Sequence, residues 1–149
     1  MIIENAGLLT EKDYQYRIDQ LRYLARHHEL DSLRKAPPQT RDSLWAKFWR
    51  DRDPTPGTAR NEAREQYYER IEYANQHFSI GIKPGWRTDM GQIYVRYGPP
   101  DEIERHPFDP EVTAYEIWYY YTEGRKFVFS DLQGFGEYRL TYPNNERMK

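Results

Sequence analysis

Acidic side chains and aromatic rings are the residues of this chain best suited to chemistry, and they are dense in the segment GWRTDMGQIYVRYGPPDEI at positions 85–103. Two carboxylates at the right separation across a cleft are enough for glycoside hydrolysis. Asp89, Asp101 and Glu116 are the candidate acids for such a hydrolase. The more ordinary roles of helix cap and salt-bridge partner are favoured for all three.

Other catalytic patterns are missing from the sequence. The chain has no cysteine, which excludes thiol catalysis, disulfides and thiolate metal sites. No serine lies in a Gly-x-Ser-x-Gly pattern, and there is no phosphate-binding loop. The histidines lack metal-ligand spacing, since the neighbours His27 and His28 diverge on a helix. The sequence therefore predicts no catalytic residue, no metal site and no cofactor.

The charge balance argues against a nucleic-acid partner. The chain carries 22 basic and 24 acidic residues, a formal net charge of −2, and shows no basic stripe. Most of the basic residues are arginine, which pairs with carboxylates and stacks on aromatic rings. There is no apolar run of the roughly 18 residues that a transmembrane helix needs, and the first residues lack the basic start and long apolar region of a signal peptide.

Hydrophobic periodicity predicts three helices in the first half of the chain. The first runs from about Glu11 to His28. The second begins after a cap at Thr40 and buries two tryptophans and a phenylalanine. The third runs from about Ala59 to Phe78, with Thr58 as its cap.

The second half is dense in aromatic and β-branched residues, which favours strands at about 113–121, 125–131 and 136–142. Short glycine-bearing turns between them are typical of antiparallel neighbours. The segment DEIER at 101–105 adds a short edge strand. These patterns predict an antiparallel meander with one face against helices.

Two local structures compete for residues 88–97, because alternate apolar residues also fit a strand. The helix is favoured, since Thr88 can cap it and Gly98 followed by Pro99 can end it. The residues expected to organise this central turn, and to form a binding surface only where exposed, are Trp86, Arg87, Asp89, Tyr97, Pro99, Pro100 and Asp101.

The segment at 85–103 resembles the motif that gives the GWxTD domain its name, a module of bacterial proteins, many of them exported. The resemblance extends back through FWRDRDPTPGTARNEAREQYYERIEYANQHF and forward through YEIWYY and GFGEYRL, over about positions 44–141. It implies a periplasmic or otherwise extracytoplasmic module, often followed by other domains, and it supplies no activity or catalytic residues. A looser likeness, at the level of the fold, is to the small outer-membrane lipoproteins of the barrel-assembly machinery, which are non-enzymatic scaffolds.

Together these patterns predict one α+β domain over 1–149, in which three N-terminal helices and a short helix pack on a small antiparallel meander. The helical part covers about 10–80, and the helix-turn and sheet cover about 85–142. The predicted function is a non-catalytic interaction or scaffolding module of a larger exported bacterial protein. Its partner would be another protein or a neighbouring domain of the same chain. The alternatives are a carboxylate hydrolase acting on glycans and, less favoured, single-stranded nucleic-acid binding on an aromatic sheet.

Overall fold

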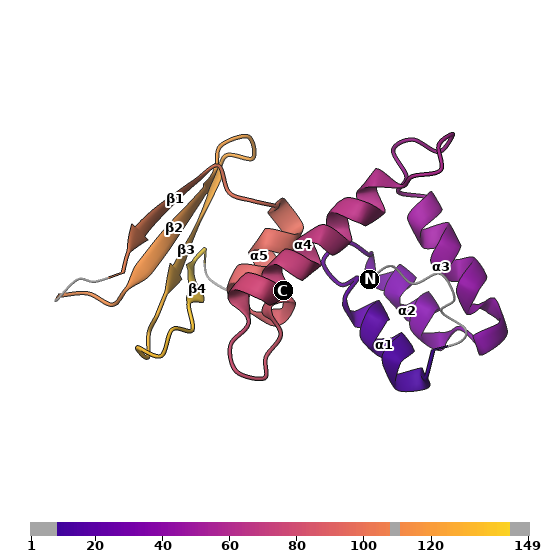
Figure 1. Ribbon diagram of the computed structural model, residues 1–149, viewed down its shortest axis with the longest axis horizontal. Coiled ribbons are helices and arrows are strands. Elements are labelled where there is room, and N and C mark those ends of the chain that lie inside the picture. The colour runs from indigo at the N-terminus through magenta and orange to yellow at the C-terminus, as the bar shows by residue number, and fades with distance from the viewer. Residues whose placement is uncertain (1–8, 108–110, 144–149) are drawn as a thin grey trace. The chain divides into compact units, whose positions relative to one another are not determined.

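The computed structural model describes residues 9–107 and 111–143. It divides into two compact units, unit 1 ending at Glu69 and unit 2 beginning at Arg70. The described residues form five α-helices and a four-stranded antiparallel sheet, which confirms the α+β class (Figure 1). No helix in these described ranges is long and apolar enough to cross a membrane.

Unit 1 is helical. It contains α1 (Glu11–Asp19), α2 (His27–Lys35), α3 (Arg41–Arg50) after a 3-10 turn at Pro38–Thr40, and the first part of α4 (Glu62–Phe78). The apolar face predicted for α3 is confirmed, since both tryptophans and the phenylalanine of this helix are buried. The buried large apolar side chains of unit 1 are Tyr14, Ile18, Leu21, Leu30, Leu33, Trp45, Phe48, Trp49, Tyr67 and Tyr68.

The prediction of one helix from Glu11 to His28 was wrong, because α1 ends at Asp19 and α2 begins only at His27. The buried Tyr67 hydroxyl donates a hydrogen bond of 2.5 Å to the carbonyl of Gln20, the first residue after α1. This carbonyl therefore has a hydrogen-bond partner without a continuing helix. The described residues therefore contain five helices where the sequence predicted four.

The cap predicted at Thr58 was also wrong, and α4 begins at Glu62, three residues later than expected. The Thr58 hydroxyl instead donates to the Thr55 carbonyl at 3.0 Å within the preceding turn. Asn61 takes the capping role, since its Oδ1 accepts from the Arg64 backbone N–H at 3.1 Å.

The start of α3 is as predicted, since the helix begins at Arg41 directly after Thr40, but the expected side-chain cap is not formed. The Thr40 side chain accepts no cap hydrogen bond, and its hydroxyl donates to the Pro37 carbonyl at 3.0 Å. The next residue, Arg41, is buried, and its guanidinium lies 2.7 Å from the Glu11 carboxylate and 4.0 Å from the centre of the Tyr14 ring. A 3-10 turn and a buried arginine therefore position α3, and a side-chain cap is not needed.

Unit 1 should lose stability in acid through Glu29. The Arg52 guanidinium donates to its two carboxylate oxygens at 2.6 and 3.0 Å and holds the pKa of Glu29 at about 2, below the ordinary 4.5. Because the folded pKa is the lower one, this stabilisation is complete above the ordinary pKa and is lost as the pH falls toward 2. We expect a loss of about 1–2 kcal/mol, since the pair is partly solvated.

Acid titration of unfolding midpoints tests this expectation. Glu29→Gln should flatten the pH dependence of the unfolding midpoint between the ordinary pKa of 4.5 and the lowered pKa of about 2. The same change at the exposed Glu69 should leave the profile as in the unchanged protein. Matching profiles for the Glu29→Gln and unchanged proteins would contradict the assignment.

Unit 2 contains the end of α4, α5 (Asp89–Tyr97), β1 (Glu102–His106), β2 (Tyr115–Tyr120), β3 (Arg125–Ser130) and β4 (Arg139–Tyr142). The strands lie in the order β1-β2-β3-β4, and all neighbours are antiparallel. This order confirms the predicted meander, with β1 as the predicted edge strand. The last strand is shorter than predicted.

The helix predicted over 88–97 is confirmed by α5. Thr88 Oγ1 accepts from the Gly91 N–H at 3.1 Å, and Gly98, with a φ of 79°, follows the last helical residue. Figure 1 shows α5 beside the sheet. The core residues that α5 shares with the strands are Met90, Ile93, Tyr94, Trp118, Tyr120, Phe127, Phe129 and Leu140.

Candidate functional site

The Gly-Trp-x-Thr-Asp segment is a close packing point between backbones. A Cβ atom on Gly85 would lie 1.7 Å from the carbonyl oxygen of Ala74 in α4. A Cβ atom on Gly91 in α5 would lie 1.6 Å from the carbonyl oxygen of Gly85. Only glycine permits such close approaches. Gly85 therefore allows the turn to contact α4, and Gly91 allows α5 to contact the turn.

The residues between the glycines fix this turn by hydrogen bonds. The backbone N–H of Trp86 donates to Asn75 Oδ1 at 3.0 Å, and the Trp86 side chain is fully buried. The Thr88 hydroxyl donates to the Gly85 carbonyl at 2.7 Å while it caps α5. Trp86 and Thr88 are both buried and therefore act in the structure of unit 2.

The candidate acids Asp89 and Asp101 each accept a hydrogen bond from a backbone N–H, at two different places in unit 2. Asp89 Oδ2 accepts from the Leu140 N–H at 2.7 Å, which ties α5 to the edge strand β4. Asp101 Oδ2 accepts from the Tyr121 N–H at 2.7 Å, just after β2. Both carboxylates are thus engaged in positioning strands.

Asp89→Ala is expected to destabilise unit 2 by about 1–3 kcal/mol, because an edge amide then loses a charged acceptor. Hydrogen exchange at the Leu140 amide should accelerate along with the loss of stability. Asp101→Ala is the matched control, and its effect should be smaller because that bond is exposed to solvent. Unchanged exchange at Leu140 in the Asp89 variant would contradict the role assigned to this carboxylate.

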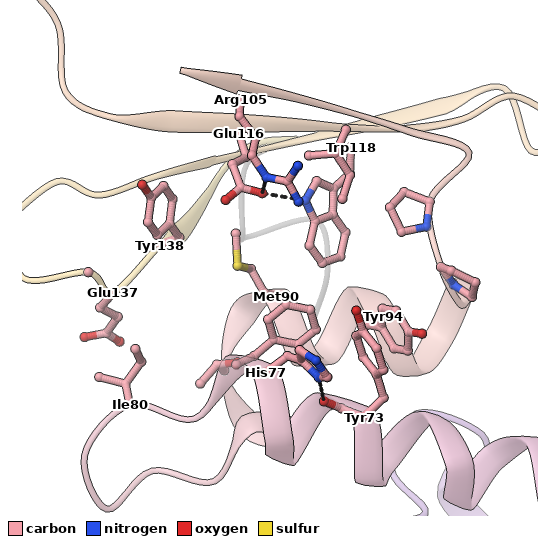
Figure 2. Close-up of a pocket in the computed structure, with 16 residues that line it drawn as sticks. Tyr73, His77, Ile80, Met90, Tyr94, Arg105, Glu116, Trp118, Glu137 and Tyr138 are labelled. Atoms are coloured by element: carbon pink, nitrogen blue, oxygen red, sulfur yellow. Dashed lines mark hydrogen bonds and ion pairs between the residues drawn. The ribbon is translucent and has the colours of Figure 1, made fainter. Parts of the chain in front are cut away.

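A pocket of about 490 Å³ lies between the inner face of the sheet and the helices α4 and α5 of unit 2. Figure 2 shows side chains from the helices directed toward Arg105, Glu116 and Trp118 of the strands. Glu137 and Tyr138, from the segment before β4, line another side. The pocket is therefore built from every layer of unit 2.

Aromatic rings form the helical wall of the pocket. Tyr73 stacks on His77 with ring centroids 3.9 Å apart and on Tyr94 with centroids 4.3 Å apart. Phe78 extends the wall, with its centroid 5.8 Å from Tyr94 and 5.5 Å from Trp118. Burial raises the pKa of Tyr94, so its hydroxyl stays neutral at physiological pH.

Glu116 provides the carboxylate on the sheet side. Its Oε1 accepts from Trp118 Nε1 at 3.2 Å, and Arg105 Nε lies 3.9 Å from the same oxygen. Glu137 also lines the pocket. Within residues 9–107 and 111–143, no three histidine, aspartate or glutamate side chains gather in a way that could hold a metal ion.

Pro99 and Pro100 are the two predicted turn residues that line this pocket. Among the three candidate acids, Glu116 lines it, and Asp89 and Asp101 do not. Tyr97 packs on the rings of Tyr120 and Phe127, with centroids 5.5 and 5.2 Å away. The turn residues that do not line the pocket are Trp86, Arg87, Asp89, Tyr97 and Asp101.

Sequence reasoning missed most of the pocket wall. Tyr94 and Trp118 have the spacing of ordinary core residues, whereas Tyr73 is partly exposed on α4, so no local pattern groups the three. The available signal was the alternation in β2, which places Glu116 on the same sheet face as Trp118.

Unit 2 is thus an α+β fold with an aromatic-walled pocket between a four-stranded meander and two helices. The chain belongs to the GWxTD domain family, whose model matches residues 9–144. The five residues Gly85 to Asp89 supply the name-giving motif. Comparisons with curated proteins and with solved structures gave no match.

Proposed function

We propose that this chain is a non-catalytic interaction module of a larger exported bacterial protein, and that the pocket of unit 2 is its contact surface for a protein partner. A periplasmic or other extracytoplasmic location and further domains are carried over from the family resemblance. The observation that carries the proposal is the aromatic wall around Tyr73, which borders a pocket large enough for one side chain or more. Aromatic side chains are enriched where proteins contact partners.

Exposed apolar side chains near the pocket add support. Ile82 and Phe135 are 105% and 84% exposed, and they lie in two loops that contribute other residues to the pocket lining. The two loops are joined by Lys83 Nζ, which lies 3.8 Å from Glu137 Oε1. Large apolar side chains on such a rim favour association with another protein.

Site-specific crosslinking in a bacterium that makes the full-length protein tests this proposal. A photoreactive phenylalanine analogue replaces Tyr73, which is 39% exposed at the pocket. The matched control replaces Leu24 of unit 1, which is 38% exposed. We expect a reproducible crosslinked partner from position 73 and none from position 24. Equal crosslinking from both positions, or no product from position 73, would contradict the proposal.

A glycan hydrolase is the second candidate, because Glu116 and Glu137 line the same pocket. Two such carboxylates could serve as acid and base. Incubation with peptidoglycan and soluble polysaccharides should release no new reducing ends. Release that disappears in the Glu116→Gln and Glu137→Gln variants would establish the hydrolase and overturn the non-catalytic proposal.

A further inference from the structure

We infer that the pocket of unit 2 binds an arginine side chain of a protein partner, and that Arg105 of the chain itself occupies the site until the partner arrives. This inference rests on the proposed function, since it names the chemistry of the partner at the same pocket.

The carboxylate of Glu116 is incompletely paired. Its side chain is 19% exposed, and Oε1 accepts one hydrogen bond, from Trp118 Nε1. Arg105 Nε lies 3.9 Å away, which is beyond hydrogen-bond distance. No described residue donates a hydrogen bond to the other oxygen, Oε2. An incoming guanidinium, with its planar fork of donors, can bind such a carboxylate through two parallel hydrogen bonds.

The aromatic wall suits the flat, weakly hydrated face of a guanidinium. Tyr73 is stacked between His77 and Tyr94, with interplanar angles of 16° and 10°, so the outer faces and the ring edges of this stack are what it offers a ligand. A guanidinium stacks on tyrosine and tryptophan faces more readily than an ammonium does. Figure 2 shows the guanidinium of Arg105 beside Glu116 and the indole of Trp118, so the pocket already accommodates this group.

Charge complementarity points to the same ligand. The charged side chains in the lining are the carboxylates of Glu116 and Glu137 and the guanidinium of Arg105. Glu137 also lies 3.8 Å from Lys83 and 3.5 Å from Arg139, so it is already matched by cations at the rim. Glu116 is the carboxylate left for an incoming cation.

Arg105 can leave the pocket when a partner binds. It lies on the edge strand β1, and its side chain is 63% exposed. An arginine from a partner, held by the partner's backbone, would replace an internal contact that is long and solvated. The exchange costs little because surface ion pairs of this kind contribute little stability.

Two small probes test the inference on the full chain. The first is N-acetyl-arginine methylamide, and the second is the citrulline analogue, which keeps the shape and lacks the charge. Binding is followed by NMR at the indole N–H of Trp118. We expect the arginine probe to bind at least about tenfold more tightly than the citrulline probe, as the loss of one charge-assisted hydrogen bond predicts.

The variants should change affinity for the arginine probe in opposite directions. Glu116→Gln should weaken it by about tenfold or more, whereas Arg105→Ala should strengthen it several-fold by removing the internal competitor. The glutamine retains an oxygen that can accept from Trp118 Nε1, and an unchanged unfolding midpoint verifies that the variant is folded. Glu104→Gln, the same change at an exposed residue of β1, should leave affinity unchanged.

Equal affinity for the two probes would overturn the inference, as would an Arg105→Ala variant that binds the arginine probe no more tightly than the unchanged protein. Crosslinking distinguishes this failure from failure of the proposed function. If the partner still crosslinks at position 73 in a Glu116→Gln background with unchanged yield, the pocket contacts its partner without arginine recognition. The inference then fails and the interaction module remains.

Discussion

Replacing Gly91 with alanine is expected to destabilise unit 2 by about 3 kcal/mol or more, in the direction opposite to helix propensity. Gly91 lies within α5, where a change from glycine to alanine ordinarily stabilises a helix by about 1 kcal/mol. Here the new methyl group would lie 1.6 Å from the carbonyl oxygen of Gly85. Because that oxygen belongs to the backbone, no side-chain rotation can relieve the overlap, and α5 must move from the turn.

Hydrogen exchange resolved by peptide mass spectrometry measures this effect within one molecule. Peptides from β2 and β3 should lose protection in the Gly91→Ala protein, while peptides from unit 1 serve as the internal reference. Gly57→Ala is the control, since a Cβ atom at that position meets nothing within 4 Å. Its effect should stay within about 0.5 kcal/mol. Stability equal to or above that of the unchanged protein in the Gly91 variant would show that the close backbone contact does not exist in solution.

Trp86→Ala is expected to cost about 3–5 kcal/mol, the range for removal of a large buried aromatic side chain. The Trp86 side chain is 0% exposed, and its backbone is fixed to α4 through Asn75. Truncation would leave a cavity that the tight glycine contacts on either side prevent from collapsing. Urea denaturation followed by the exchange of unit 2 peptides measures the loss.

The neighbouring Arg87 supplies the control for Trp86. Its guanidinium lies 4.9 Å from the centre of the Trp86 ring, but the residue is exposed. Arg87→Ala should therefore cost clearly less than Trp86→Ala, because it removes no buried aromatic side chain. Comparable losses in the two variants would mean that Trp86 is not the buried anchor described here.

These expectations explain why the segment at 85–103 is so dense in glycine, aromatic and acidic residues. Gly85 and Gly91 allow backbones to meet, Trp86 fills the core, and Asp89 holds the edge strand. Of the three acids that first indicated a hydrolase, Asp89 and Asp101 are used to position strands, and Glu116 lines the pocket together with Glu137. The family motif therefore has an architectural explanation, and the candidate binding surface lies beside it.

The sequence by itself determined the elements whose signals are local. Thr88 and Gly98 directly flank α5, so both ends of this helix could be predicted from the sequence. The meander could be predicted in the same way, because the alternation of apolar and polar residues along a strand and the glycines in its turns are properties of short segments. Phe127 and Phe129 are both buried as this alternation predicts.

Only the tertiary structure decided the end of α1 and the existence of the pocket. The hydroxyl of Tyr67, 47 positions along the chain, satisfies the Gln20 carbonyl, and no pattern around Gln20 indicates that bond. The pocket brings together Tyr73, which is partly exposed on α4, and Trp118, which was indistinguishable from ordinary core in the sequence. A core residue becomes part of a binding surface when the packing around it is left incomplete, and incomplete packing is a property of the assembled fold that no single segment carries.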